Sequence, residues 1–531
     1  MKIFPPKRAI RSSLVSISLI LSSGNLYAQQ SSNSNGSVVD RFSPAPVVTI
    51  GGFVNASAGF RSEDSAFGKN RLPDAAIQNG AVIENGGQQT GTQNRMTNNP
   101  DFTNEAEIHL KVAGINEFGM KYGAIVELEA NTSSPARNEG VSADKAYIFT
   151  ESRMGKLELG NNSAVNHKMK VGPETFARGA GGINGKYLEY INLPMLANSS
   201  QLAIQGNRAC AGGVGVDADG KTVSTTAACN NIKLPSFILI PQSPIAHGGY
   251  ARSFYNSQNS ADYNSTSGAA SFGFNKNKST IRNGQFGDLE DATKINYYTP
   301  RISGWQLGAT FTPDTGNNGT SASISGNSGD IKQAISYGVN YSDNFGNVGF
   351  AVSATGETGK FEQLSTATTQ RNNLQAYDIG FMASYFGATF GASYGNWGKS
   401  LQPKTGIYSC NYNSTSLLTN QTCAAGSATN TKFGDATYYS TGAAYQFGPF
   451  AASVTYLDSN FQANKYNAMS FGVDYRMAKG LMPYFEVTQY KFVSNQPKAS
   501  GIINQTTLSN KERQLKDNSG YVVLAGLLFS F

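Results

Sequence analysis

Polar and apolar residues alternate one by one along much of this chain. Over residues 105–112, every odd position is charged or ionisable and every even position is apolar. A period of two places the two sets on opposite faces of a β-strand, so that one face is wet and the other apolar. A soluble sandwich has the same alternation, so a single strand of this kind does not identify the fold.

The number of alternating segments is more informative. About sixteen follow one another from Val47 to the C-terminus, and they cover residues 47–61, 104–115, 119–131, 144–152, 156–161, 292–300, 304–313, 330–342, 347–356, 373–386, 388–397, 435–447, 449–459, 464–478, 481–492 and 519–531. An even number of strands is typical of bacterial outer-membrane barrels. The pattern therefore predicts an all-β fold, a 16-stranded antiparallel transmembrane β-barrel.

The connections between these segments alternate in length. Residues 62–103 and 162–291 form long connections, whereas 116–118, 153–155 and 301–303 are tight turns. A barrel whose two rims face the periplasm and the exterior sorts its loops in this way, and a sandwich has no reason to do so. Closure into a barrel also removes strand edges, which lipid does not tolerate.

The first 28 residues have the pattern of a secretory signal peptide. Four basic residues precede a short apolar stretch, and residues 26–28 form a cleavage site that ends at Ala28. We therefore expect a signal peptide at 1–28, a short N-terminal extension at 29–46 and a barrel at 47–531, which includes the long loop at 162–291.

Composition excludes several classes of protein. Only 15% of residues are charged, against about a quarter in ordinary soluble domains, and no run approaches the 18 or so apolar residues of a membrane helix. Loss of the four basic residues of the signal peptide lowers the net charge from +7 to +3, so nucleic-acid binding has little electrostatic basis. The three histidines are too scattered for a metal motif, and we expect no cofactor.

The C-terminal segment and several internal segments resemble the Gram-negative general porin family. The last strand has one apolar face and ends at Phe531, and the resemblance extends to residues 48–60, 146–160 and 294–308. It implies a channel in the bacterial outer membrane through which small hydrophilic solutes and ions diffuse passively. It also implies that Phe531 is the signal for the barrel assembly machinery, that outer-membrane lipid and lipopolysaccharide surround the barrel, and that the assembly is a homotrimer.

In this family the third extracellular loop folds into the barrel and narrows it, and residues 162–291 occupy its place. The stretch at 172–179 resembles the acidic signature of that loop, although Thr175 interrupts it and Arg178 adds an opposite charge. Loops of this length are usually functional or disordered. We expect the loop to turn toward the lumen, and the sequence leaves open whether it plugs, narrows or caps the pore.

Charged residues concentrate on the expected lumen face of the first five strands. Counting strand rises from the short turns places four of them near mid-height: His109, Lys111, Glu127 and Lys145. We predict that they form a constriction opposite loop carboxylates such as Glu174 and Glu189, which would select solutes by charge and size. The alternative is a salt-bridged wall with no special role.

Four cysteines suit an exported protein, and four permit three pairings. Cys210 and Cys229 share the long third loop, and Cys410 and Cys423 share the loop after the eleventh strand, so local pairing is the simplest hypothesis. A zinc site at the second pair is a poor competitor because no further ligand lies nearby.

Two other functions compete with that of a channel. A hydrolase would need a serine activated by histidine, and neither His109 nor His247 has a flanking motif that supports this. We therefore expect no enzyme. A surface adhesin or antigen with large binding loops is compatible with a pore, and the sequence leaves it open.

The outward face of the first five strands carries small or slim side chains, among them Gly52, Ala56 and Ala58, whereas later strands carry outward aromatics. Small residues allow close packing in membranes, so we expect strands one to five and the last strand to form the contact of the homotrimer.

Overall fold

A computed structural model gives the fold of this protein. It describes residues 45–63, 76–78, 81–83, 100–130, 142–191, 214–216, 222–224, 237–244, 292–315, 331–361, 372–400, 411–412, 421–422, 435–461, 464–493 and 517–531. The expected signal peptide, its cleavage after Ala28 and the four cysteines lie outside these residues.

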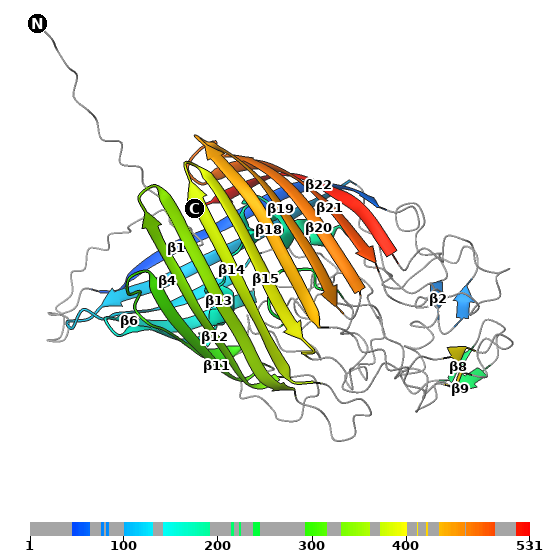
Figure 1. The fold of residues 1–531 in the computed structure, drawn as a ribbon, viewed down its shortest axis with the longest axis horizontal. Helices are drawn as coiled ribbons and strands as arrows, with labels where there is room; N and C mark the ends of the chain where they lie inside the picture. The colour runs from blue at the N-terminus through cyan, green and yellow to red at the C-terminus, as the bar shows by residue number, and fades with distance from the viewer. Residues whose placement is uncertain are drawn as a thin grey trace, which may run out of the picture.

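Sixteen antiparallel strands form one closed barrel, which Figure 1 shows from the side. Around the barrel they are β1 (Val47–Glu63), β4 (Asp101–Ile115), β5 (Lys121–Glu129), β6 (Ser142–Ser152), β7 (Gly155–Asn161), β10 (Thr293–Tyr298), β11 (Trp305–Asp314), β12 (Ile331–Phe345), β13 (Val348–Phe361), β14 (Leu374–Tyr385), β15 (Ala388–Gly398), β18 (Ala436–Phe447), β19 (Phe450–Phe461), β20 (Asn464–Tyr475), β21 (Leu481–Val493) and β22 (Asp517–Ser530). Each predicted segment overlaps one of these strands, with ends that differ by up to five residues, so the predicted fold class is confirmed.

Three short two-stranded ladders lie outside the barrel sheet. They pair β2 (Ala76–Gln78) with β3 (Ala81–Ile83), β8 (Val214–Val216) with β9 (Thr222–Ser224), and β16 (Asn411–Tyr412) with β17 (Gln421–Thr422). Within the described residues, no helix has both the length and the apolar character needed to cross a membrane.

The barrel closes where the first strand meets the last. In the β1–β22 pairing, Phe53 lies opposite Ser530 and Ala58 opposite Ala525. The N–H of Phe531 donates to the carbonyl of Gly52 at 3.1 Å, and the N–H of Gly52 donates to the carbonyl of Phe531 at 3.2 Å. Gly52 has φ +155°, which side-chain-bearing residues rarely adopt. The terminal aromatic residue therefore completes the hydrogen-bond ladder that seals the barrel.

The tight turns all lie at one rim. They join β4 to β5, β6 to β7, β10 to β11, β12 to β13, β14 to β15, β18 to β19 and β20 to β21. Short turns mark the periplasmic rim of outer-membrane barrels, so the opposite rim is the extracellular one.

Outward aromatic side chains gather at two levels of the outer wall. Near the short turns, Trp305 and Tyr341 have ring centroids 4.9 Å apart. Toward the extracellular rim, Tyr377 and Tyr394 lie 6.5 Å apart, and all four residues come from β11 to β15. Two aromatic girdles around an apolar band are characteristic of barrels in lipid.

Four short helices follow β7 in the described part of the long loop. They are α2 (Val165–Lys168), η2 (Pro173–Thr175), η3 (Gly182–Asn184) and η4 (Lys186–Glu189). Each helix contacts strands further around the barrel than the one before it. The first helix, α2, contacts β10 to β13, and η2 contacts β15 and β18. The next, η3, contacts β19 to β21, and η4 contacts β22. The loop therefore follows the inner wall of the barrel for much of its circumference.

Candidate functional site

Small inward residues make room for the loop on the wall from β11 to β20. A Cβ at Gly308 would meet the sulfur of Met169 at 2.4 Å, and a Cβ at Gly380 would meet the carbonyl oxygen of Val171 at 1.6 Å. A Cβ at Gly442 would lie 2.9 Å from the ring of Pro173. Because contacts this short force something to shift, these glycines are required by the close approach of the loop.

Buried polar contacts fix the loop to this wall. The Glu486 carboxylate accepts hydrogen bonds from the N–H groups of Ala180 at 2.6 Å and Gly182 at 3.0 Å. The Arg178 guanidinium pairs with Asp474. Glu486 and Asp474 are both less than a tenth exposed. Hydrogen bonds to charged groups contribute about 1.5–3 kcal/mol each, so this part of the loop is firmly held.

A second stretch of the loop, residues 237–244, also lies among inward side chains. The ring of Phe237 contacts that of Phe492, with centroids 4.9 Å apart, and Ser459 Oγ donates to the carbonyl of Ile238 at 2.7 Å. The indole N–H of Trp397 donates to the carbonyl of Gln242 at 2.7 Å. Residues 237–240 and the inward residues around them form a buried apolar core, so the extracellular half of this wall is filled rather than open.

The wall formed by β4, β5 and β6 is different, because its inward charged side chains stay partly exposed. The exposed fraction is 20% for the side chain of Glu107, 14% for His109, 12% for Glu127 and 16% for Lys145. The inward rings of Tyr466 and Phe492, on β20 and β21, are fully buried by comparison. Water therefore reaches the charged wall.

Strand register brings three of the four predicted wall residues together. His109 lies opposite Glu127 on β5, and Glu127 lies opposite Lys145 on β6. The Lys145 ammonium contacts Glu127 Oε2 at 2.7 Å, and His109 Nε2 lies 2.9 Å from Glu107 Oε1. Lys111 lies one inward position nearer the short turns, with its ammonium 5.9 Å from the ring centroid of Phe149.

The ligand atoms of Glu107, His109 and Glu127 lie within 4.8 Å of one another, a spacing that could hold a metal ion. The ammonium of Lys145 already contacts Glu127 and lies 3.5 Å from Asp144. A fixed cation therefore supplies positive charge beside this cluster.

The sequence predicts that Glu174 faces the lysines of the wall formed by β4 to β6. The structure places it elsewhere. This residue is only 7% exposed and lies on the opposite wall, where it pairs with Lys170 and accepts a 2.8 Å hydrogen bond from Ser393. The side chain of Glu189 lies outside the described residues. The placement of Glu174 follows from the path of the loop, which carries η2 onto β15 and β18.

The loop instead presents lysines to the carboxylates of the wall. Early in the loop, Lys168 contacts Glu158 at 2.8 Å. Near the end of the first described stretch of the loop, Lys186 contacts Glu105 at 3.1 Å. Desolvation lowers the pKa of Lys168 from its ordinary value of 10.5, and Glu158 partly offsets this. These two ion pairs bound the exposed part of the charged wall on either side. Neither was predicted, because no local signal relates a loop lysine to one particular strand.

Comparison with known proteins gives a consistent result. A family model described as Gram-negative porin matches residues 15–229 and 247–495. An uncharacterized protein of Rickettsia typhi is 30% identical over 250 residues, which is 38% of this chain and 51% of that protein. One of Rickettsia bellii is 25% identical over 412 residues, 70% of this chain and 74% of that protein. The chain spans about half the length of the first of these relatives.

Two solved structures are similar in outline. The anion-selective porin from Comamonas acidovorans is 13% identical, with a TM-score of 0.44, over 92% of this chain and 100% of that chain. A triple mutant of the Rhodopseudomonas blastica porin is 11% identical, with a TM-score of 0.43, over 91% of this chain and 100% of that chain.

Proposed function

Because the chain belongs to the Gram-negative porin family, and is thus an outer-membrane β-barrel, we propose that it forms a water-filled channel for passive diffusion of small hydrophilic solutes and ions. The observation that carries this proposal is the contrast between the two inner walls. Charged side chains of β4 to β6 are partly exposed inside the barrel, whereas the inward residues of β18 to β22 are buried against the loop. Family and fold favour a channel over an enzyme.

The narrowest part of the channel lies between the loop and the charged wall in this proposal. Two ion pairs flank this part of the channel, Lys168 with Glu158 and Lys186 with Glu105. Between them, on the strand wall, lies the pair of Glu127 with Lys145. Rings of charged side chains select solutes by sign and size. In these three pairs each carboxylate has a lysine partner, which supports only a weak preference between anions and cations.

Planar-bilayer recordings in a salt gradient test this arrangement. The reversal potential of the wild-type channel should lie close to zero, and solutes of either sign should pass. A strong preference for one sign would mean that the wall and the loop are not paired as described.

Export and assembly complete the proposal. The signal peptide at 1–28 directs export, the barrel assembly machinery reads Phe531, and outer-membrane lipid with lipopolysaccharide surrounds the folded barrel. Backbone pairing of Phe531 with Gly52 supports a role for the C-terminus in closure. Deletion of Phe531 should lower the yield of heat-modifiable barrel in outer membranes. An unchanged yield would contradict that role.

A homotrimer through β1, β4 to β7 and β22 is the proposed assembly. Large exposed hydrophobic side chains on this outer wall are mostly aliphatic, as at Ile50, Val54 and Ile148, and a flat wall allows close packing. Ala56→Trp with Ala58→Trp should give folded monomers on native gels. Gly52 is unsuitable for this test, because a Cβ there would lie 2.2 Å from the carbonyl oxygen of Glu107. A trimer that persists in the double variant would place the contact elsewhere.

Local disulfides, Cys210 with Cys229 and Cys410 with Cys423, stay part of the proposal. Peptide mapping by mass spectrometry without reduction distinguishes them from the other two pairings.

A further inference from the structure

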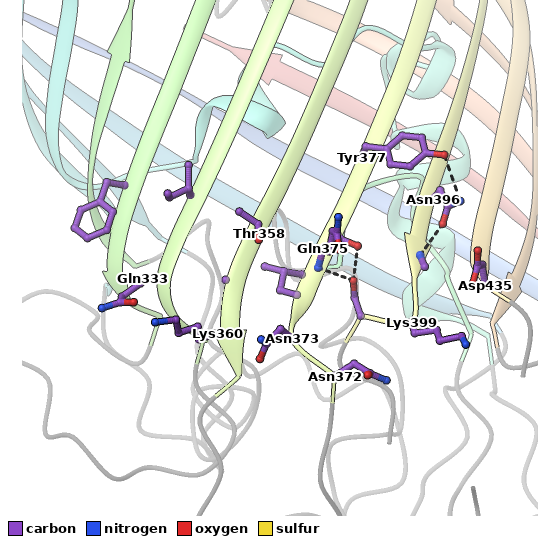
Figure 2. A pocket seen from close by; sticks show the side chains of 16 residues that line it. Gln333, Thr358, Lys360, Asn372, Asn373, Gln375, Tyr377, Asn396, Lys399 and Asp435 are labelled. Carbon is purple, nitrogen blue, oxygen red and sulfur yellow. Dashed lines mark hydrogen bonds between the residues drawn. The ribbon is translucent and has the colours of Figure 1, made fainter. Parts of the chain in front are cut away.

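A pocket opens on the outer surface of the barrel at its extracellular rim. It lies across the ends of β12, β13, β14 and β15 that are remote from the short turns, and its volume is about 1010 Å³ (Figure 2). Figure 2 shows side chains from all four strands around it, with Lys360 and Lys399 near the rim. We call it the outer-rim pocket.

Burial along the strands places the pocket on the outside. Ile335, Thr358 and Tyr377 line it and are exposed, whereas their neighbours Ala334 and Ala376 are buried. Alternating residues of a strand point to opposite faces, so Ile335, Thr358 and Tyr377 lie on the face that contacts lipid, whereas Leu374 and Ser400, which also line the pocket, are buried. The pocket therefore opens toward the outer leaflet of the membrane rather than toward the pore.

The lining changes from apolar to polar along the membrane normal. The side nearer the membrane centre is formed by Phe311, Ile335 and Tyr377, each 45–47% exposed. The side at the rim carries amides and two lysines: Gln333, Asn372, Asn373, Gln375, Lys360 and Lys399. An apolar zone beneath a polar one, at the level of an aromatic girdle, suits a molecule with acyl chains and a polar head.

Charge favours an anionic head. Lys360 and Lys399 are exposed and form no ion pair with a carboxylate of the described residues. Among the described residues that line the pocket, Asp435 is the one acidic residue. Long lysine stems lie along apolar surface while their ammonium groups reach the level of lipid head groups. Basic pockets at this level recognise phosphorylated head groups.

The polar part of the pocket is held in place before any ligand arrives. The N–H of Gln375 donates to Ser400 Oγ at 2.8 Å, and Ser400 Oγ donates to the carbonyl of Gln375 at 2.6 Å. Asn396 accepts a 2.6 Å bond from the N–H of Gly398 and lies 3.4 Å from the hydroxyl of Tyr377. Figure 2 shows these bonds on β14 and around the end of β15, drawn above the two lysines, which lie nearer the rim. A preformed site loses less conformational freedom on binding.

We propose that the outer-rim pocket binds the phosphorylated head group of an outer-leaflet lipid, with Lys360 and Lys399 on the phosphate and the acyl chains over Phe311, Ile335 and Tyr377. The apolar side of the pocket distinguishes this ligand from free phosphate, which has nothing to place there. The proposal rests on the barrel lying in the outer membrane and not on the pore conducting.

Binding of bisphosphorylated lipid A to the purified full-length barrel, measured by native mass spectrometry, tests it. Lys360→Gln with Lys399→Gln should weaken binding about tenfold or more, since each lysine near a charged lipid surface contributes about one factor of five. Lipid A without phosphates should bind the wild type weakly. Its affinity should match that of bisphosphorylated lipid A for the double lysine variant. Inorganic phosphate at millimolar concentration should not compete.

Two further variants sharpen the result. Lys465→Gln with Lys491→Gln is the matched control, because these exposed lysines lie near the same rim on β20 and β21, away from the pocket. It should leave binding within twofold of the wild type. Thr358→Trp, which fills the pocket without removing charge, should weaken binding. Equal losses in the control and the lysine variant, or full binding by Thr358→Trp, would overturn the proposal. Heat-modifiable mobility confirms that each variant is folded, and conductance is measured separately to test the pore.

Discussion

Release of the second loop stretch should open the channel. Phe237 is 2% exposed and Ile238 is fully buried, and both lie in the apolar core inside the barrel. Truncation of a buried phenylalanine to alanine costs about 3–5 kcal/mol and of a buried isoleucine about 2–5 kcal/mol. A cost of about 2 kcal/mol, the smallest of these values, reduces the ratio of docked to undocked loop by more than about tenfold, because each 1.36 kcal/mol corresponds to one factor of ten.

The barrel itself should survive Phe237→Ala with Ile238→Ala, since neither residue belongs to the strand ladder. We therefore expect a folded, heat-modifiable barrel with higher single-channel conductance and a loop that is cut faster by protease. Phe118→Ala is the control, because Phe118 is 85% exposed in a short turn. Wild-type conductance together with wild-type proteolysis in the double variant would refute the idea that this stretch is docked and narrows the pore.

Three further predictions follow from the same geometry. Lys111→Glu with Lys145→Glu should shift the reversal potential in a salt gradient toward cation preference, because it places new carboxylates on a wall that already holds Glu127; no shift would favour a wall with no role in selectivity. Glu486→Gln removes the charge that accepts two loop N–H bonds, so current noise and protease sensitivity of the loop should rise, and unchanged values would mean that other contacts hold the loop. Deletion of residues 200–280 should enlarge the solute cut-off in liposome swelling, whereas an unchanged cut-off would mean that this part of the loop does not narrow the pore.

The sequence was sufficient for the barrel and for its charged wall. Alternation along each strand fixes which side chains face inward, so the neighbourhood of His109, Glu127 and Lys145 followed from strand order and the positions of the short turns. Phe531 was recognisable as the end of the closing strand, although only the structure shows its backbone pairing with Gly52.

The path of the loop was not predictable in the same way. Pairs such as Lys186 with Glu105 depend on where a long connection crosses the barrel, and no periodic pattern encodes that route. The expected place of Glu174 was wrong because this loop carboxylate was assumed to face Lys111 and Lys145 on the wall of β4 to β6, whereas it pairs with Lys170, four residues earlier in the loop itself. The small inward residues Gly308 and Gly380 were a usable signal, since a wall without side chains leaves room for another segment.

The central claim is that a water-filled channel runs between the loop and the wall of β4 to β6. Single-channel recording of the purified barrel in a planar bilayer tests it most directly, with Lys145→Trp beside the wild type, since Lys145 lies on that wall. We expect stepwise conductance in the wild type and a clearly smaller step in the variant. A folded wild-type barrel with no conductance, or an identical step in Lys145→Trp, would contradict it.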